Sequence, residues 1–259
     1  MNGDAATAAP EERGSEGLPE MSLLDHLTEL RRRLVVSVIA FVAAMLICWG
    51  FSAQLFDLLT APVVRLLPED ADRLAFLSLT EPFVLYLKVA AVGGLFLASP
   101  VLIYQIWMFV APGLYRRERL YAIPVVFASV ACFLLGGFFG YRVLFPVMAE
   151  FFLSLGADFR QLLTVNSLFG FLLRTLIGCA LIFEWPIVVF FLARLGMLTA
   201  GGMWRNFRYA ILIIFIIAAV VTPTPDFATQ TILAMPMLLL YAVGILIAWA
   251  VQPRDDLDA

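Results

Sequence analysis

The sequence predicts an all-α integral membrane protein with six transmembrane helices. Hydrophobic residues make up 63% of its 259 residues, and its mean hydropathy is +0.96, far above the usual range of soluble domains. The apolar stretches are continuous and do not alternate with polar residues, which favours helices over a closed β-barrel. We therefore expect one helical domain that lies within a lipid bilayer.

Six apolar runs have about the length that a hydrocarbon core requires. They cover residues 34–51, 83–111, 120–141, 168–193, 209–221 and 232–251. Residues 21–251 would form a single six-span domain between a disordered acidic tail at 1–20 and a short acidic tail at 252–259. The fifth run is too short for a normal bilayer, so either the membrane is locally thinner there or the span extends beyond this run.

The basic residues predict the orientation of these spans. With the N-terminus in the cytoplasm, eleven of the 17 basic residues fall inside and four outside, so the positive-inside rule places both termini in the cytoplasm. Lys88 and Arg174 lie within spans near their outer ends, where long side chains can snorkel. The N-terminal tail has no apolar signal core and no transit-peptide composition, which favours a multi-pass protein of a bacterial or archaeal plasma membrane. The residues counted inside are Arg13, Arg31, Arg32, Arg33, Arg116, Arg117, Arg119, Arg194, Arg205, Arg208 and Arg254.

One carboxylate, Glu184, lies deep in the fourth run, in CALIFEWPIVVFF. An ionised carboxylate in hydrocarbon is costly, so this group should be protonated, hydrogen-bonded or turned toward a wet cavity. The alternative is a polar contact that joins two helices. Prolines recur inside the predicted spans and tend to kink helices, which would allow the bundle to enclose a concavity.

A second pair of carboxylates lies at the predicted cytoplasmic face. The segment SLLDHLTELRRRL forms an amphipathic helix that continues into the first span, with Glu29 on its polar face. Glu29 and Arg33 have the i, i+4 spacing of a helical ion pair. The loop APGLYRRERLY again has one acid, Glu118, among arginines. If the fold brings them together, each carboxylate could bind a guanidinium group through both oxygens.

The chain resembles the TatC family, the multi-spanning receptor and core subunit of the twin-arginine protein translocase. The resemblance runs from about residue 21 to 251 and rests on HLTELRRRL, APVVRLLP, SPVLIYQIWMFVAPGLYRRER, VLFP, FEWP and TPTPDFATQTILAMP. It implies a cup-like bundle of six helices with both termini cytoplasmic. The sequence departs from the family pattern at Thr224, which stands between the two prolines of TPTPD.

The resemblance also implies roles for individual residues. Glu29 and Glu118 match the acidic residues that bind the twin-arginine signal peptide. Arg31, Phe109 and Leu114 match residues around that site. Glu184 matches a buried glutamate that faces the concave cavity, and Pro62 and Asp226 match positions in extracytoplasmic loops. Thr222, Gln230 and Thr231 match a polar cluster at the ends of two short helices, the fifth and the sixth. Partner helices of TatA and TatB dock at that cluster.

The resemblance therefore implies a receptor that binds twin-arginine signal peptides at the cytoplasmic face. It would nucleate a complex, driven by the protonmotive force, that exports folded proteins. The implied partners are TatA- and TatB-like single-span proteins, signal peptides, membrane lipid and further copies of the chain. No cofactor, metal or enzymatic activity is implied, and the charge and hydropathy argue against nucleic-acid binding.

Two other function classes are considered. A proton-coupled secondary transporter could use Glu184 as its protonatable residue, but such transporters favour inverted repeats, and the two halves of this chain show no matching pattern. An intramembrane protease needs a nucleophile and a base that meet inside the membrane. The sole histidine, His26, lies outside the predicted spans, and no GxSxG segment occurs.

Overall fold

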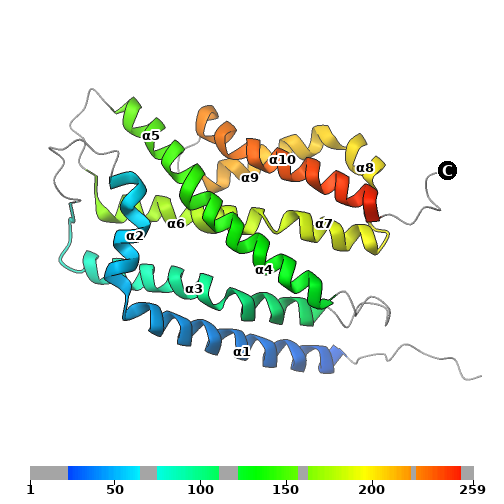
Figure 1. Ribbon diagram of the computed structural model, residues 1–259, viewed down its shortest axis with the longest axis horizontal. Coiled ribbons are helices and arrows are strands. Elements are labelled where there is room, and N and C mark those ends of the chain that lie inside the picture. Colours follow the sequence, from blue (N-terminus) through cyan, green and yellow to red (C-terminus); the bar gives the residue numbers. More distant parts are fainter. Residues whose placement is uncertain (1–22, 65–74, 111–121, 157–162, 223–225, 252–259) are drawn as a thin grey trace, which may run out of the picture.

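The structure is a computed structural model that describes residues 23–64, 75–110, 122–156, 163–222 and 226–251 (Figure 1). Within these residues all regular structure is helical, apart from one isolated parallel bridge between Ala75 and Thr164. This confirms the predicted all-α membrane fold. Five helical segments are long and apolar enough to cross a bilayer, and Phe207–Val221 is shorter, so the count of six spans stays a prediction.

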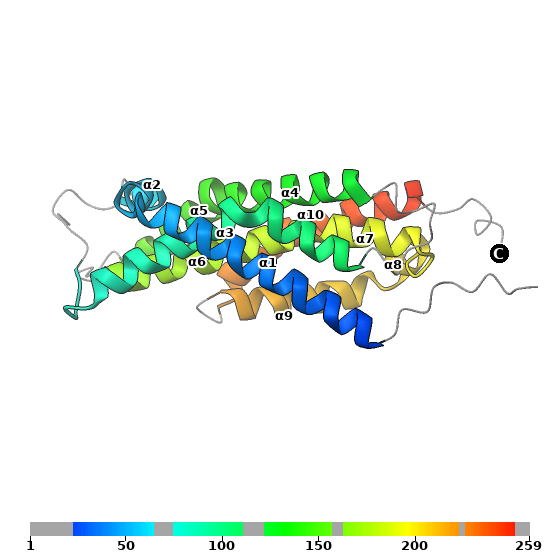
Figure 2. The same cartoon turned by 90° about the horizontal axis from the view of Figure 1, so that it is seen from below.

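The first two long helices pack against each other along their length. α1 (Leu23–Trp49) and α3 (Glu81–Val110) lie side by side in both views, joined by the shorter α2 (Ser52–Val64) (Figures 1 and 2). His26 stacks on Phe109 at one end, and Trp49 packs on Phe83 at the other, so the two helices are antiparallel. Gly94 allows this close approach, because a Cβ there would lie 2.7 Å from the Met45 backbone.

Pro62 lies inside α2, so the connection between the first two predicted spans, where Pro62 was expected, contains a short helix. Proline removes the donor to the carbonyl four residues earlier, here that of Leu58. The Tyr141 hydroxyl donates to this carbonyl at 2.5 Å, so the helix can continue through the proline.

The third long segment continues past its predicted end. α4 (Ala122–Phe139) passes through a π-helical turn at Gly140–Leu144 directly into α5 (Phe145–Leu155). The run predicted at 120–141 therefore extends for several further turns. Arg142 therefore lies within the continuous helical segment, in its π turn, and not at its end.

The fourth predicted span consists of two helices. α6 (Val165–Ile182) ends with Phe183 as its C-cap residue, and α7 (Trp185–Arg194) begins after Glu184. Pro186 lies in the first turn of α7, where the absence of an N–H costs little. The interruption places Glu184 at the junction of two helices rather than along one continuous face.

The last three helices cover one side of α7. They are α8 (Ala200–Arg205), α9 (Phe207–Val221) and α10 (Phe227–Val251). α10 packs on α7, α8 and α9 (Figures 1 and 2). α10 has 25 residues and is long enough to span, so the expectation of two short terminal helices is wrong for α10 and holds for α9 alone, which has 15.

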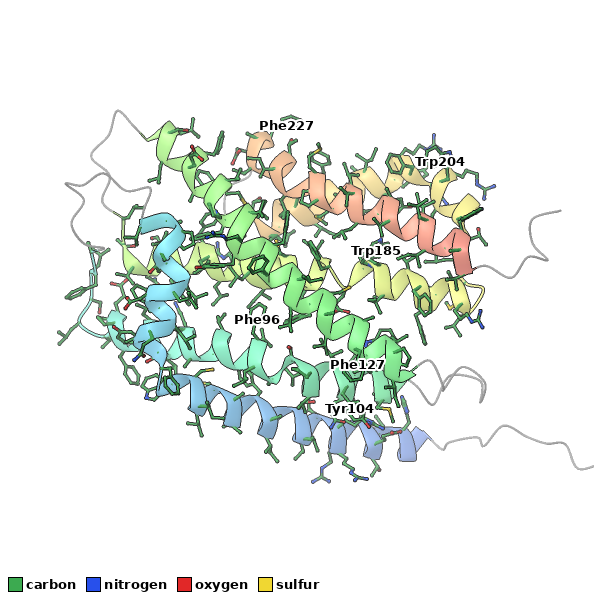
Figure 3. The ribbon with its side chains drawn as sticks, in the orientation of Figure 1. Phe96, Tyr104, Phe127, Trp185, Trp204 and Phe227 are labelled. Carbon is green, nitrogen blue, oxygen red and sulfur yellow. The ribbon has the colours of Figure 1, made fainter. Side chains whose placement is uncertain are left out.

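Large apolar side chains remain on the outside of the bundle. Phe127, Trp204 and Phe227 are 73%, 71% and 75% exposed (Figure 3). Such residues are expected on a surface in contact with lipid, where apolar exposure carries no hydrophobic penalty. Lys88, predicted to snorkel, donates a hydrogen bond of 2.8 Å to Asn166 in the first turn of α6.

Candidate functional site

Glu29 lies where the N-terminal part of α1 meets the C-terminal part of α3. Its Oε1 accepts a hydrogen bond of 3.0 Å from Arg33 Nε and a second one from Arg33 Nη2. Arg33 Nη1 in turn donates to Gln105 Oε1 of α3 at 3.3 Å. The Glu29 and Arg33 side chains are 22% and 19% exposed, so this ion pair is partly withdrawn from solvent.

An aromatic stack lies one turn away from this ion pair. The rings of His26 and Phe109 are 4.4 Å apart and nearly parallel, at 24°. His26 precedes Glu29 by three residues and Phe109 follows Gln105 by four, so both pairs lie on the same faces of the two helices. Phe109 thus lies one turn from the ion pair of Glu29, and its role in signal binding stays a prediction.

Of the remaining residues predicted for signal binding, the structure describes Arg31 alone. Arg31 is exposed on α1, two residues from Glu29 and therefore on another side of the helix. Leu114 and Glu118 lie outside the described residues. The sequence interpretation missed Gln105, although a lone amide within the long apolar run was an available signal.

Glu184 lies at the break between α6 and α7 and is hydrogen-bonded to a neighbouring helix. Its Oε2 accepts a bond of 2.5 Å from the hydroxyl of Ser129 on α4. The same hydroxyl accepts a bond of 2.9 Å from Trp107 Nε1 on α3. Ser129 is fully buried and so joins three parts of the bundle. Among the described residues, Glu184 Oε1 is a buried side-chain oxygen without a hydrogen-bond partner.

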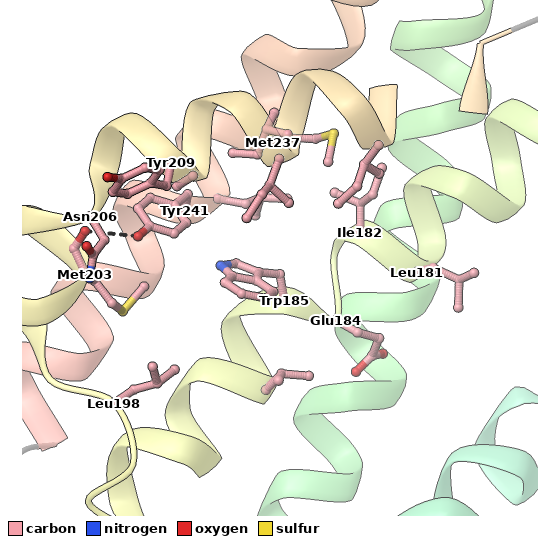
Figure 4. Close-up of a pocket in the computed structure, with 16 residues that line it drawn as sticks. Leu181, Ile182, Glu184, Trp185, Leu198, Met203, Asn206, Tyr209, Met237 and Tyr241 are labelled. Atoms are coloured by element: carbon pink, nitrogen blue, oxygen red, sulfur yellow. Dashed lines mark hydrogen bonds between the residues drawn. The ribbon is translucent and has the colours of Figure 1, made fainter. Parts of the chain in front are cut away.

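A pocket of about 480 Å³ opens on the other side of Glu184, between α7, α9 and α10 (Figure 4). Apart from Glu184, the lining residues with polar side-chain groups are Trp185, Asn206, Tyr209 and Tyr241, and the Tyr241 hydroxyl donates to the Met203 carbonyl at 3.0 Å. The carboxylate of Glu184 points away from Trp185 and Tyr241, at the margin of the pocket (Figure 4). The pocket is therefore largely apolar, and Glu184 is its one acidic lining residue.

The predicted partner-docking cluster lies around the start of α10. Asp226 caps this helix: its Oδ1 accepts from the Thr229 N–H at 2.8 Å and its Oδ2 from the Thr229 hydroxyl at 2.5 Å. The hydroxyls of Thr222 and Thr231 donate to carbonyls of their own helices. Among the described residues, no partner within hydrogen-bond distance is recorded for the half-buried side chain of Gln230. Thr224 lies outside the described residues.

Comparisons with known proteins agree on one family. The family model described as Sec-independent protein translocase protein (TatC) matches residues 25–236. The TatC protein of Koribacter versatilis is 43% identical over 242 residues, covering 93% of this chain and 89% of its own length. That of Aquifex aeolicus is 37% identical over 230 residues, covering 87% and 93%.

A solved structure has the same fold. The crystal structure of the twin-arginine translocase receptor TatC superposes with a TM-score of 0.77 at 34% identity. The match covers 87% of this chain and 99% of that protein.

Proposed function

The chain belongs to the TatC family of Sec-independent protein translocase proteins, and we propose that it is the receptor for twin-arginine signal peptides in such a translocase. One solved relative is described as the twin-arginine translocase receptor. The observation that carries the proposal is the carboxylate of Glu29, fixed between two helices at one end of the bundle. A cationic signal needs an acidic acceptor in a defined position.

In this proposal Glu29 and Glu118 bind the two guanidinium groups of the signal. Both termini and this end of the bundle face the cytoplasm of a bacterial or archaeal cell. The apolar segment of the signal follows the lipid-facing side of the bundle. The Glu184 margin and the start of α10, with Gln230, receive single-span partners of the TatA and TatB kind. Export of folded cargo is driven by the protonmotive force.

The test is site-specific photocrosslinking to a reporter signal peptide in native membranes, from an aromatic photoprobe that replaces Phe109 and leaves Glu29 and Glu118 in place. An Arg-Arg signal should crosslink strongly, and a Lys-Lys signal weakly, because an ammonium group cannot form the paired hydrogen bonds of a guanidinium. Glu29→Gln should reduce the Arg-Arg crosslink. Glu81→Gln is the matched control, because Glu81 lies at the opposite end of α3 and bonds its own loop.

Equal crosslinking in wild type, Glu29→Gln and Glu81→Gln would refute the role of Glu29. Absence of a crosslink with either signal, in membranes that contain folded protein, would favour the transporter alternative. A proton-uptake assay on Glu184→Gln would then be the next measurement.

A further inference from the structure

Arg33 binds only one of the two carboxylate oxygens of Glu29. Both hydrogen bonds from Arg33 end on Oε1. Among the described residues, Oε2 has no recorded hydrogen-bond partner, and it is not one of the buried side-chain oxygens. A carboxylate has lone pairs for about four hydrogen bonds, so Glu29 can accept a further donor while Arg33 stays in place.

Arg33 is held from its other side by α3. Its Nη1 donates to Gln105 Oε1, so one guanidinium group joins Glu29 on its own helix to an amide on the neighbouring helix. An exposed i, i+4 ion pair is worth only a few tenths of a kcal/mol and would leave both side chains free to change rotamer. The bond to Gln105 adds a fixed point 72 residues away in sequence.

We propose that Gln105, acting through Arg33, is a positioning residue of the signal-peptide site that turns Oε2 of Glu29 toward the incoming guanidinium. This inference rests on the proposed receptor function and extends it. The incoming arginine then shares Glu29 with Arg33 and does not displace it. Arg33 and Gln105 do not themselves touch the signal.

The arrangement has a consequence for specificity. A guanidinium group gains most over an ammonium group when it bonds both oxygens of a carboxylate in parallel. With Oε1 taken by Arg33, Glu29 offers a single oxygen, for which an ammonium group is nearly as good a donor. The signal position that Glu29 binds therefore tolerates lysine. The weak binding of a Lys-Lys signal then results from the lysine at the other signal position.

The test measures binding of synthetic signal peptides to the full chain in lipid nanodiscs. The peptides carry Arg-Arg, Arg-Lys, Lys-Arg or Lys-Lys. In wild type, one single-lysine peptide should bind within about threefold of Arg-Arg, and the other should be much weaker. Equal, large losses for both single-lysine peptides would overturn the one-oxygen arrangement.

Variants at position 105 test the positioning role. Gln105→Leu keeps the size but removes the acceptor, and it should weaken Arg-Arg binding about three- to tenfold. Gln105→Glu retains an acceptor for Arg33 and should preserve binding. Tyr104→Phe is the control, because Tyr104 is exposed and its hydroxyl makes no hydrogen bond to another described residue.

A double-mutant cycle separates positioning from a general structural effect. In the Glu29→Gln background, Gln105→Leu should have little further effect on binding, because the group that it positions is already altered. The inference would be overturned if Gln105→Leu lowered the affinity for the Arg-Arg peptide by the same factor in both backgrounds. It would also be overturned if Gln105→Glu failed to bind that peptide. If Glu29→Gln alone leaves Arg-Arg binding unchanged, the receptor proposal fails, which is a distinguishable result.

Discussion

The hydroxyl of Tyr141 donates a 2.5 Å hydrogen bond to the carbonyl of Leu58, the acceptor that Pro62 deprives of its helical donor. Tyr141 lies in the π-helical turn between α4 and α5, and Leu58 lies in α2. The bond therefore joins two helices that are distant in sequence and satisfies a backbone group at the same time. Ser99 acts similarly within α3, where its hydroxyl donates to the Phe96 carbonyl, at 2.7 Å, four residues before Pro100.

Tyr141→Phe should lower the stability of the folded protein by about 1 kcal/mol, because it leaves the Leu58 carbonyl without a donor. The measurement is thermal unfolding in detergent with a thiol-reactive dye, which reaches the buried thiols of Cys48 and Cys179 only when the helices separate. Tyr104→Phe again serves as the control.

Pro62→Ala provides the decisive second variant for this bond. Alanine restores the backbone N–H that can donate to the Leu58 carbonyl, so Tyr141→Phe should cost less in that background. The same loss in both backgrounds would show that Tyr141 does not compensate for the proline.

Ser129→Ala should lower the melting temperature more than Trp107→Phe does. The serine variant breaks both bonds of the Trp107, Ser129 and Glu184 chain, whereas the tryptophan variant breaks one. Leaving the buried Glu184 carboxyl without its donor is costly. The melting temperature should therefore fall less in Trp107→Phe than in Ser129→Ala. The reverse order would mean that ring packing on Phe191, and not the bond, dominates.

Glu184→Ala separates a structural role from a functional one at this site. If Glu184 acts on partners, the variant should assemble in the membrane but alter crosslinks to single-span partners or reduce export. Glu184→Gln is the matched variant, because an amide oxygen can still accept from Ser129. Loss of folded Glu184→Ala protein, with normal export by whatever remains, would instead support a contact that only holds helices together.

Gln230→Leu should weaken co-purification of a single-span partner. The amide is half-buried at the start of α10, and the described residues offer it no recorded side-chain bond, so it is available to another chain. Gln54→Leu is the control, because it makes the same change at an exposed position of α2, outside the predicted docking cluster. Undiminished association of Gln230→Leu would place the docking site elsewhere.

The overall fold was predictable because lipid-facing helices have a compositional signature. Each of the six apolar runs overlaps a helix of the structure. The departures from regular helices were not predictable in the same way. The break at Glu184 has a local signal in Pro186, whereas the π turn at Gly140–Leu144 makes contacts with residues far away in sequence, such as the bond between Tyr141 and Leu58 across 83 positions.

At the candidate site, too, local features were predictable from the sequence and contacts between distant residues were not. The i, i+4 spacing predicted the ion pair between Glu29 and Arg33, since that spacing is a local property of a helix. The bond from Arg33 to Gln105 depends on the register between α1 and α3, which local sequence does not specify. One close contact between these two helices lies at Gly94, where a Cβ would meet the Met45 backbone at 2.7 Å.

Gly94→Ala should therefore disturb both stability and signal binding. The added Cβ would lie 2.7 Å from both the Cα and the nitrogen of Met45, which are backbone atoms that cannot move aside as a side-chain tip can. The helices must separate or slide, at a cost of about 1–3 kcal/mol. Since the same helix pair carries Glu29 and Gln105, the affinity for an Arg-Arg peptide should fall together with the melting temperature.

Gly170→Ala is the matched control for this substitution. A Cβ at Gly170 of α6 meets nothing within 4 Å, so the only expected effect is the better helix propensity of alanine, a gain of up to about 1 kcal/mol. A higher or unchanged melting temperature for Gly170→Ala, together with a lower one for Gly94→Ala, would establish that contact between α1 and α3 is the cause. If Gly94→Ala binds the peptide normally despite a lower melting temperature, the geometry at Glu29 does not depend on this contact.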